Sequence, residues 1–131
     1  MTSANGSTSP TGQRRNILLV EDELMIRMLL EDILVDLGYS IVATAGRVDE
    51  AITLAKNASI DGAILDVNLN GQTVSPVADI LAARGLPFVF ATGYGEHGVP
   101  DHFRDRPTLQ KPFQPETVNR ILSRIFQPQP A

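Results

Sequence analysis

Five polar side chains occur in this sequence where short apolar segments end. They are Glu21, Asp22, Asp66, Thr92 and Lys111. If the apolar segments are strands of a parallel sheet, their carboxyl ends meet at one edge, where such sheets place their ligand sites. We therefore expect three carboxylates, one hydroxyl and one ammonium to share a crevice.

These residue types favour phosphoryl chemistry. Three clustered carboxylates repel one another, which raises their pKa values unless a cation neutralises them. Oxygen ligands without a nearby His or Cys suit Mg²⁺, which is commonly held by one or two carboxylates together with phosphate oxygens. A carboxylate can attack phosphorus, while Lys111 and Thr92 can bind phosphoryl oxygens. The pattern thus indicates Mg²⁺-dependent phosphoryl transfer.

The elements that must position these side chains alternate along the chain. Apolar runs predict strands at residues 16–20, 40–45, 62–65, 87–91 and 108–110, and amphipathic segments predict helices at about 26–37, 47–58, 76–84 and from 115 onward. Glycines and prolines between 92 and 107 leave room only for a short fourth helix near 101–104. Five βα units predict a doubly wound α/β fold with a five-stranded parallel sheet.

The first helical segment has apolar residues at helical spacing. We expect this set to face the core: Ile26, Leu29, Leu30, Ile33 and Leu37. The closing helix begins at Pro115, a residue favoured in the first turn, and Val118, Ile121, Leu122 and Ile125 form its inward face.

Composition narrows the class of protein. The 131 residues suit one domain, and 43% hydrophobic with 20% charged residues is typical of a globular chain. The absence of Cys excludes disulfides and thiolate sites and fits a cytoplasmic location. A net charge of −4 argues against direct nucleic-acid binding. We expect a flexible tail at 1–14 without signal or membrane segment, a folded domain at 15–127 and a C-terminal tail at 128–131.

Over residues 16 to about 126, the pattern resembles the receiver domain of bacterial response regulators. The matching motifs are Glu21-Asp22, Leu65-Asp66, Phe90-Ala91-Thr92-Gly93 and Lys111-Pro112-Phe113. The resemblance implies a flavodoxin-like strand order 2-1-3-4-5 and a cis peptide bond between Lys111 and Pro112. It also implies that Asp66 accepts a phosphoryl group, with Thr92 and Lys111 binding its oxygens. The implied metal ligands are Asp22 directly, Glu21 largely through water, Asp66, and the carbonyl of Asn68.

The resemblance further implies partners and a role. The phosphoryl donor would be a histidine kinase, a histidine phosphotransfer protein or a small acyl phosphate. Phe90-Ala91-Thr92-Gly93-Tyr94 is similar to the signature of a subfamily of single-domain receivers. Such a protein is not a turnover enzyme and signals by binding a downstream protein. Two alternatives are a receiver excised from a longer regulator and a constitutive protein-binding pseudo-receiver.

Two positions depart from the family pattern. Thr108, three residues before Lys111, occupies a position where many receivers carry Tyr or Phe that rotates on phosphorylation. The segment after Asp66 lacks the Pro often found four residues beyond the acceptor, which indicates a different loop geometry. We hypothesise that Tyr94 supplies the missing aromatic readout.

Other functional interpretations fit less well. Residues 93–98 match a dinucleotide-binding Gly pattern, but they follow the fourth predicted strand and Pro100 interrupts the helix that should follow. His97 and His102 have no rigid helical spacing and are expected to be solvated rather than metal-bound. A hydrolase with an aspartyl-phosphate intermediate resembles a pattern with a second Asp two residues after the nucleophile, where this chain has Asn68.

Overall fold

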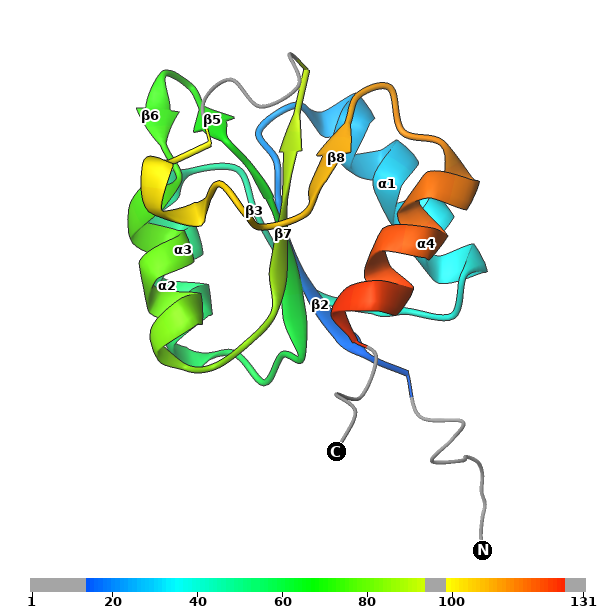
Figure 1. Ribbon diagram of the computed structural model, residues 1–131, viewed down its shortest axis with the longest axis horizontal. Coiled ribbons are helices and arrows are strands. Elements are labelled where there is room, and N and C mark those ends of the chain that lie inside the picture. The colour runs from blue at the N-terminus through cyan, green and yellow to red at the C-terminus, as the bar shows by residue number, and fades with distance from the viewer. Residues whose placement is uncertain (1–13, 94–98, 127–131) are drawn as a thin grey trace, which may run out of the picture.

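A parallel sheet forms the centre of the computed structural model, which describes residues 14–93 and 99–126. Its strands are β2 (Asn16–Val20), β3 (Ser40–Ala45), β4 (Gly62–Asp66), β7 (Phe88–Thr92) and β8 (Thr108–Gln110). They lie in the order β3-β2-β4-β7-β8, and every neighbouring pair is parallel. Counted along the chain, this is the order 2-1-3-4-5, which confirms the predicted topology (Figure 1).

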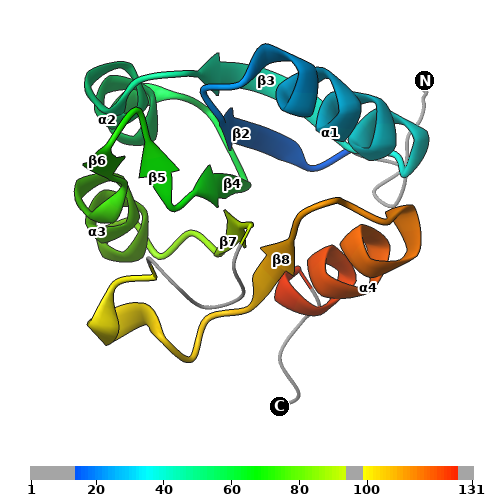
Figure 2. The ribbon, with the colours of Figure 1, turned by 90° about the horizontal axis from the view of Figure 1, so that it is seen from above.

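Helices cover both faces of the sheet. α1 (Leu24–Asp36) and α4 (Pro115–Ile125) lie on one face, and α2 (Val48–Asn57) and α3 (Ser75–Ala83) lie on the other (Figure 2). The predicted short fourth helix is a 3₁₀ turn, η1 (Asp101–Phe103). Within the described residues, no helix has both the length and the apolar character needed to span a membrane.

Two hydrophobic clusters hold the layers together. In β2, Ile17 and Leu19 pack toward α1 and α4, while Leu18 and Val20 pack toward α2 and α3. Successive side chains of a strand point to opposite faces, so a central strand covered on both faces must be apolar throughout. This explains why β2 appears in the sequence as an unbroken apolar run.

The predicted inward face of α1 was partly wrong. Leu30 and Ile33 are buried as predicted, but 47% of Leu29 is exposed, and Leu34, which was not predicted, is fully buried. α1 carries apolar residues around much of its circumference, so helical spacing alone does not select one stripe. The actual core stripe leaves apolar side chains at the start of α1 in solvent.

The residue before β2 and the residue after α4 meet at the amino end of β4. A Cβ atom on Gly62 would lie 2.6 Å from Cζ of Phe126, so only glycine allows this ring to cover the strand. The Arg15 guanidinium lies 5.1 Å from the centre of the same ring. The predicted tails lie almost entirely outside the described residues, and those boundaries stay a prediction.

Candidate functional site

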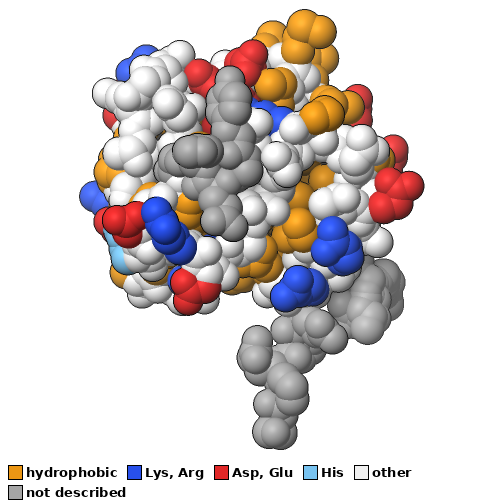
Figure 3. All heavy atoms as spheres, turned by 45° about the horizontal axis from the view of Figure 1, so that its top comes forward, with side chains coloured by type: hydrophobic (Ala, Val, Ile, Leu, Met, Phe, Trp, Pro, Cys, Tyr) orange, Lys and Arg blue, Asp and Glu red, His pale blue; other side chains and the backbone are white. Residues whose placement is uncertain are grey.

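The predicted site residues converge at the carboxyl edge of the sheet. Asp66 and Thr92 are the last residues of β4 and β7, one position further into the strands than predicted, while Glu21 and Lys111 directly follow β2 and β8. A pocket of about 840 Å³ opens there, and its lining includes Asp22, Asp66, Asn68, Thr92 and Lys111. Figure 3 brings this edge forward and shows acidic and hydrophobic side chains close together around it.

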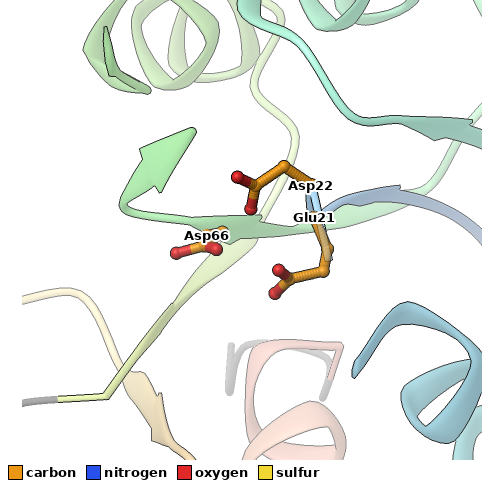
Figure 4. A group of neighbouring side chains, drawn as sticks. All are labelled: Glu21, Asp22 and Asp66. Atoms are coloured by element: carbon orange, nitrogen blue, oxygen red, sulfur yellow. The ribbon is translucent and has the colours of Figure 1, made fainter. Parts of the chain in front are cut away.

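Three carboxylates face one another at this edge. Glu21, Asp22 and Asp66 each place a carboxylate oxygen within 4.8 Å of the others (Figure 4). Glu21 and Asp66 are buried, whereas Asp22 is half-buried. A hard divalent cation suits this donor set, because all three groups are anionic oxygen ligands. The predicted acidic cluster is therefore present, and its chemistry fits Mg²⁺.

Lys111 is the internal counterion of this cluster. Its Nζ lies 3.1 Å from Glu21 Oε1 and 3.2 Å from Asp66 Oδ2. Burial opposes the charge of Lys111, but the carboxylates of Asp66 and Glu21 outweigh it and raise the lysine pKa above its usual value. The peptide bond between Lys111 and Pro112 is cis, as predicted.

The electrostatics of Glu21 differ from those of an ordinary surface carboxyl. Burial raises the pKa of Glu21 to about 7; a hydrogen bond from the Glu23 N–H opposes this shift, the nearby Asp66 charge adds to it, and Lys111 opposes it. The Glu23 N–H donates to Glu21 Oε2 at 3.1 Å. Near neutral pH, Glu21 is thus poised between its neutral and ionised forms.

Thr92 lies next to the lysine in the sheet. It is buried at the end of β7, and its carbonyl oxygen accepts a hydrogen bond of 3.0 Å from the Lys111 N–H. Thr92 and Lys111 therefore reach the pocket from adjacent strands with a fixed backbone relationship. This arrangement allows a hydroxyl and an ammonium to meet the same phosphoryl group.

The segment after Asp66 is a small hairpin where a loop was predicted. β5 (Asn68–Leu69) and β6 (Gln72–Thr73) pair antiparallel across an Asn70-Gly71 turn. Asn70 has φ of 51° and Gly71 has φ of 82°, the positive values that a type I′ turn requires. Proline is locked near −65°, so it does not fit at position 70. The Asn-Gly dipeptide was the sequence signal that could have predicted this hairpin.

Asn68, the predicted fourth metal ligand, starts this hairpin. Its N–H donates to Asp66 Oδ1 at 3.3 Å, and its own Oδ1 accepts a 2.8 Å hydrogen bond from the Gly71 N–H. Asn68 therefore lies beside the acceptor and lines the pocket, with its side chain committed to the turn. The role of its backbone carbonyl as a metal ligand stays a prediction.

An exposed apolar surface adjoins the pocket. We call it the α1 patch, and it consists of Leu24, Met25, Met28 and Leu29, which are between 47% and 83% exposed. Leu29 also lines the pocket, together with Ile26, Pro112 and Phe113. Contiguous apolar surface beside a functional pocket is typical of a protein-binding site. The sequence pattern does not reveal this surface, because helical spacing places Leu29 in the core set.

Aromatic packing lies beside the half-buried Thr108 rather than at it. Thr108 pairs with Phe90, and Phe103 of η1 packs on Phe90 and Phe88 at ring-centre distances of 6.0 and 5.4 Å. The Arg106 guanidinium lies 4.5 Å from the centre of the Phe88 ring. Tyr94, the hypothesised aromatic readout, lies outside the described residues.

Of the two histidines, the structure describes His102, which does not belong to the carboxylate cluster. His102 Nε2 lies 3.0 Å from Asp79 Oδ1 of α3, and both side chains are largely exposed. This pair connects η1 to α3. His97 and the Gly pattern from position 94 onward lie outside the described residues.

Comparison with known proteins identifies the family. The model of the response regulator receiver domain matches residues 17–123. The transcriptional regulatory protein PdtaR of Mycobacterium tuberculosis is 30% identical over 112 residues, which are 85% of this chain and 55% of PdtaR. The chain thus spans about half the length of this curated relative.

Solved structures of receivers show the same fold at higher identity. The solution structure of SdrG from Sphingomonas melonis Fr1 is 48% identical with a TM-score of 0.78, covering 86% of this chain and 96% of SdrG. The receiver domain of PhyR from Erythrobacter litoralis is 31% identical with a TM-score of 0.74, covering 90% and 95%. These neighbours are signalling regulators rather than turnover enzymes, as predicted. The chain belongs to the response regulator receiver domain family of two-component signalling.

Proposed function

We propose that this protein accepts a phosphoryl group on Asp66 from a histidine kinase or histidine phosphotransfer protein, and that phosphorylation changes its binding to a downstream protein. The observation that carries this proposal is the contact of Lys111 with both Asp66 and Glu21, beside Asp22, at the pocket. The protein would act in the cytoplasm, without direct contact with nucleic acid or membrane.

The transfer step follows from the positions of the side chains. A carboxylate oxygen of Asp66 attacks phosphorus, and the bond between phosphorus and the donor imidazole nitrogen breaks. The electron pair stays on the imidazole, which leaves neutral when its other nitrogen carries a proton. Lys111 and the Thr92 hydroxyl bind the phosphoryl oxygens, so the lysine exchanges part of its contact with Asp66 for the arriving group.

Mg²⁺ is the cofactor that this site suits. When bound, it would neutralise the carboxylates and the charge of the phosphoryl group. Glu21, Asp22, Asp66 and the Asn68 carbonyl would hold it.

The same residues leave the protein without an obvious general acid for rapid hydrolysis, since Asn68 occupies the position where the phosphatase pattern has Asp. This supports a phosphorylated state that lasts long enough to signal.

The α1 patch supports a protein as the phosphoryl donor. A donor histidine must approach Asp66 through the pocket, and the patch continues the apolar part of the pocket rim along α1. An amphipathic helix that carries the phosphohistidine could cover both surfaces at once. A small acyl phosphate needs only the pocket itself.

The comparisons support a single-domain receiver as the first candidate. The chain covers 96% of SdrG as its solution structure contains it, and this coverage supports a receiver without a further domain. The second candidate is the receiver part of a longer regulator, which the coverage of only 55% of PdtaR favours. The site chemistry is the same in both.

Intact-mass spectrometry after incubation with acetyl phosphate and Mg²⁺ tests the proposal. The wild type should gain one phosphoryl group, and Asp66→Asn should gain none. Asp36→Asn, an exposed carboxylate of α1 remote from the cluster, is the matched control and should be phosphorylated like the wild type. The proposal fails if the wild type gains no mass or if Asp66→Asn gains as much.

A further inference from the structure

The tip of the β5–β6 hairpin contacts the acidic cluster through a single backbone group. The N–H of Asn70 donates to Asp22 Oδ2 at 3.2 Å, across a sequence separation of 48 residues. Asp22 lies between β2 and α1, whereas Asn70 lies beyond β4. The contact therefore joins the segments that follow the neighbouring strands β2 and β4.

The turn is built to present this N–H. Positive φ at both Asn70 and Gly71 gives the tight type I′ turn, and the hydrogen bond from Gly71 N–H to Asn68 Oδ1 fixes it from within. Asn tolerates the left-handed region better than other side-chain-bearing residues. Residue 70 thus stays in place, and its N–H remains directed at Asp22.

Asp22 has the greatest need of such a partner. Lys111 pairs with Glu21 and Asp66, but in the part of the chain that the structure describes Asp22 forms no ion pair. Its carboxylate lines the pocket and is only half-buried, so its side chain would otherwise sample several rotamers. The Asn70 N–H favours the rotamer seen here.

We propose that Asn70 is a positioning residue that orients Asp22 for the divalent cation before the cation binds. This inference rests on the proposed function, because it assigns Asp22 to the cation site. Hydrogen bonds to a metal-binding carboxylate fix its orientation, and their loss typically weakens metal binding about 10- to 100-fold. The hairpin that replaces the usual proline-containing loop thereby becomes part of the cation site.

The test measures Mg²⁺ binding to the unphosphorylated protein by calorimetry or by NMR titration. Asn70→Pro removes the N–H and cannot adopt positive φ, so the dissociation constant for Mg²⁺ should rise about tenfold or more. Asn70→Gly keeps the N–H and the turn, and its dissociation constant should stay within about twofold of the wild type. NMR spectra report whether each variant keeps the fold.

A double-mutant cycle separates positioning of Asp22 from general distortion of the hairpin. In an Asp22→Asn background, Asn70→Pro should weaken Mg²⁺ binding little further, because the carboxylate that the N–H orients is gone. The inference is overturned if Asn70→Pro binds Mg²⁺ like the wild type, or if its effect is as large without Asp22. Either result leaves phosphorylation of Asp66 intact as a proposal, whereas equal phosphorylation of Asp66→Asn refutes the proposed function itself.

Discussion

Lys111 Nζ lies 3.2 Å from Asp66 Oδ2, so the proposed phosphoryl acceptor starts in an ion pair. The same ammonium contacts Glu21 at 3.1 Å. When all three carboxylates of the cluster are ionised, the Lys111 ammonium neutralises one of the three negative charges. One divalent cation can neutralise the remaining two. The charge of the fully ionised site thus matches one divalent cation.

Removal of the lysine charge should destabilise the metal-free protein and slow phosphorylation. Lys111→Ala leaves two buried carboxylates without their cation, a change that costs about 3 kcal/mol when one partner of a buried pair is lost. The phosphorylation rate should fall roughly a hundredfold, as for other lost transition-state contacts. Urea unfolding without Mg²⁺ and intact-mass kinetics measure the two effects. Lys111→Arg should keep most of the stability, and equal stability of Lys111→Ala and wild type would contradict the prediction.

Ionisation of Glu21 should make stability depend on pH. Its pKa is about 7 in the folded protein and 4.5 as an unperturbed carboxyl, so between these values the folded state binds more protons than the unfolded state. The contribution of Glu21 is therefore fully present below about pH 4.5 and is lost as pH rises through about 7. The free energy of unfolding can be measured with urea, without Mg²⁺, at about pH 5 and about pH 8. Between these two pH values it should fall less for Glu21→Gln than for the wild type. An identical pH dependence in both proteins would rule this out.

A charge introduced into the α1 patch should slow phosphorylation by a protein donor but not by a small acyl phosphate. Met25 is 83% exposed, so Met25→Glu should preserve the fold but place an unpaired charge against an apolar donor surface. Phosphotransfer from a cognate phosphorylated kinase or phosphotransfer protein should slow by about tenfold, a loss of about 1.4 kcal/mol. Phosphorylation by acetyl phosphate should not change. Val35→Glu, at the opposite end of α1 and 52% exposed, is the matched control.

Phe103, the last residue of η1, should couple the conformation of η1 to the state of the site. Phe88, Phe90 and Thr92 alternate along β7 and share one face, where Phe103 packs. In NMR titrations with Mg²⁺ and beryllofluoride, a phosphoryl mimic, amide shifts in η1 should be large in the wild type and at least about halved in Phe103→Leu. Unchanged shifts in the variant would show that this ring does not transmit the signal.

The strands and the site could be predicted because burial and chemistry leave clear patterns. A strand covered on both faces is apolar throughout, and this places Asp66 and Thr92 at the sheet edge to within one residue. Side-chain partners leave no such pattern. The pairing of Lys111 with Glu21 as well as Asp66 follows from the three-dimensional positions of β2, β4 and β8.

The errors have physical causes. Leu29 was assigned to the core because helical periodicity does not distinguish an apolar residue that faces the sheet from one that faces solvent. The hairpin was missed because its strands have only two residues each, too short to show alternation. Asn70-Gly71 still carried the turn signal, and the structure adds what no pattern contains, the contact of its N–H with Asp22.

The meeting of Arg15 with Phe126 at the start of β4 has a practical consequence for handling the molecule. Both segments lie at the amino ends of the strands (Figure 1), whereas the pocket is lined by residues at the carboxyl ends. An affinity tag, a fluorophore or a surface tether joined through either segment would leave the entrance to Asp66 clear. The proximity of these segments also makes the domain suitable for circular permutation with a short linker.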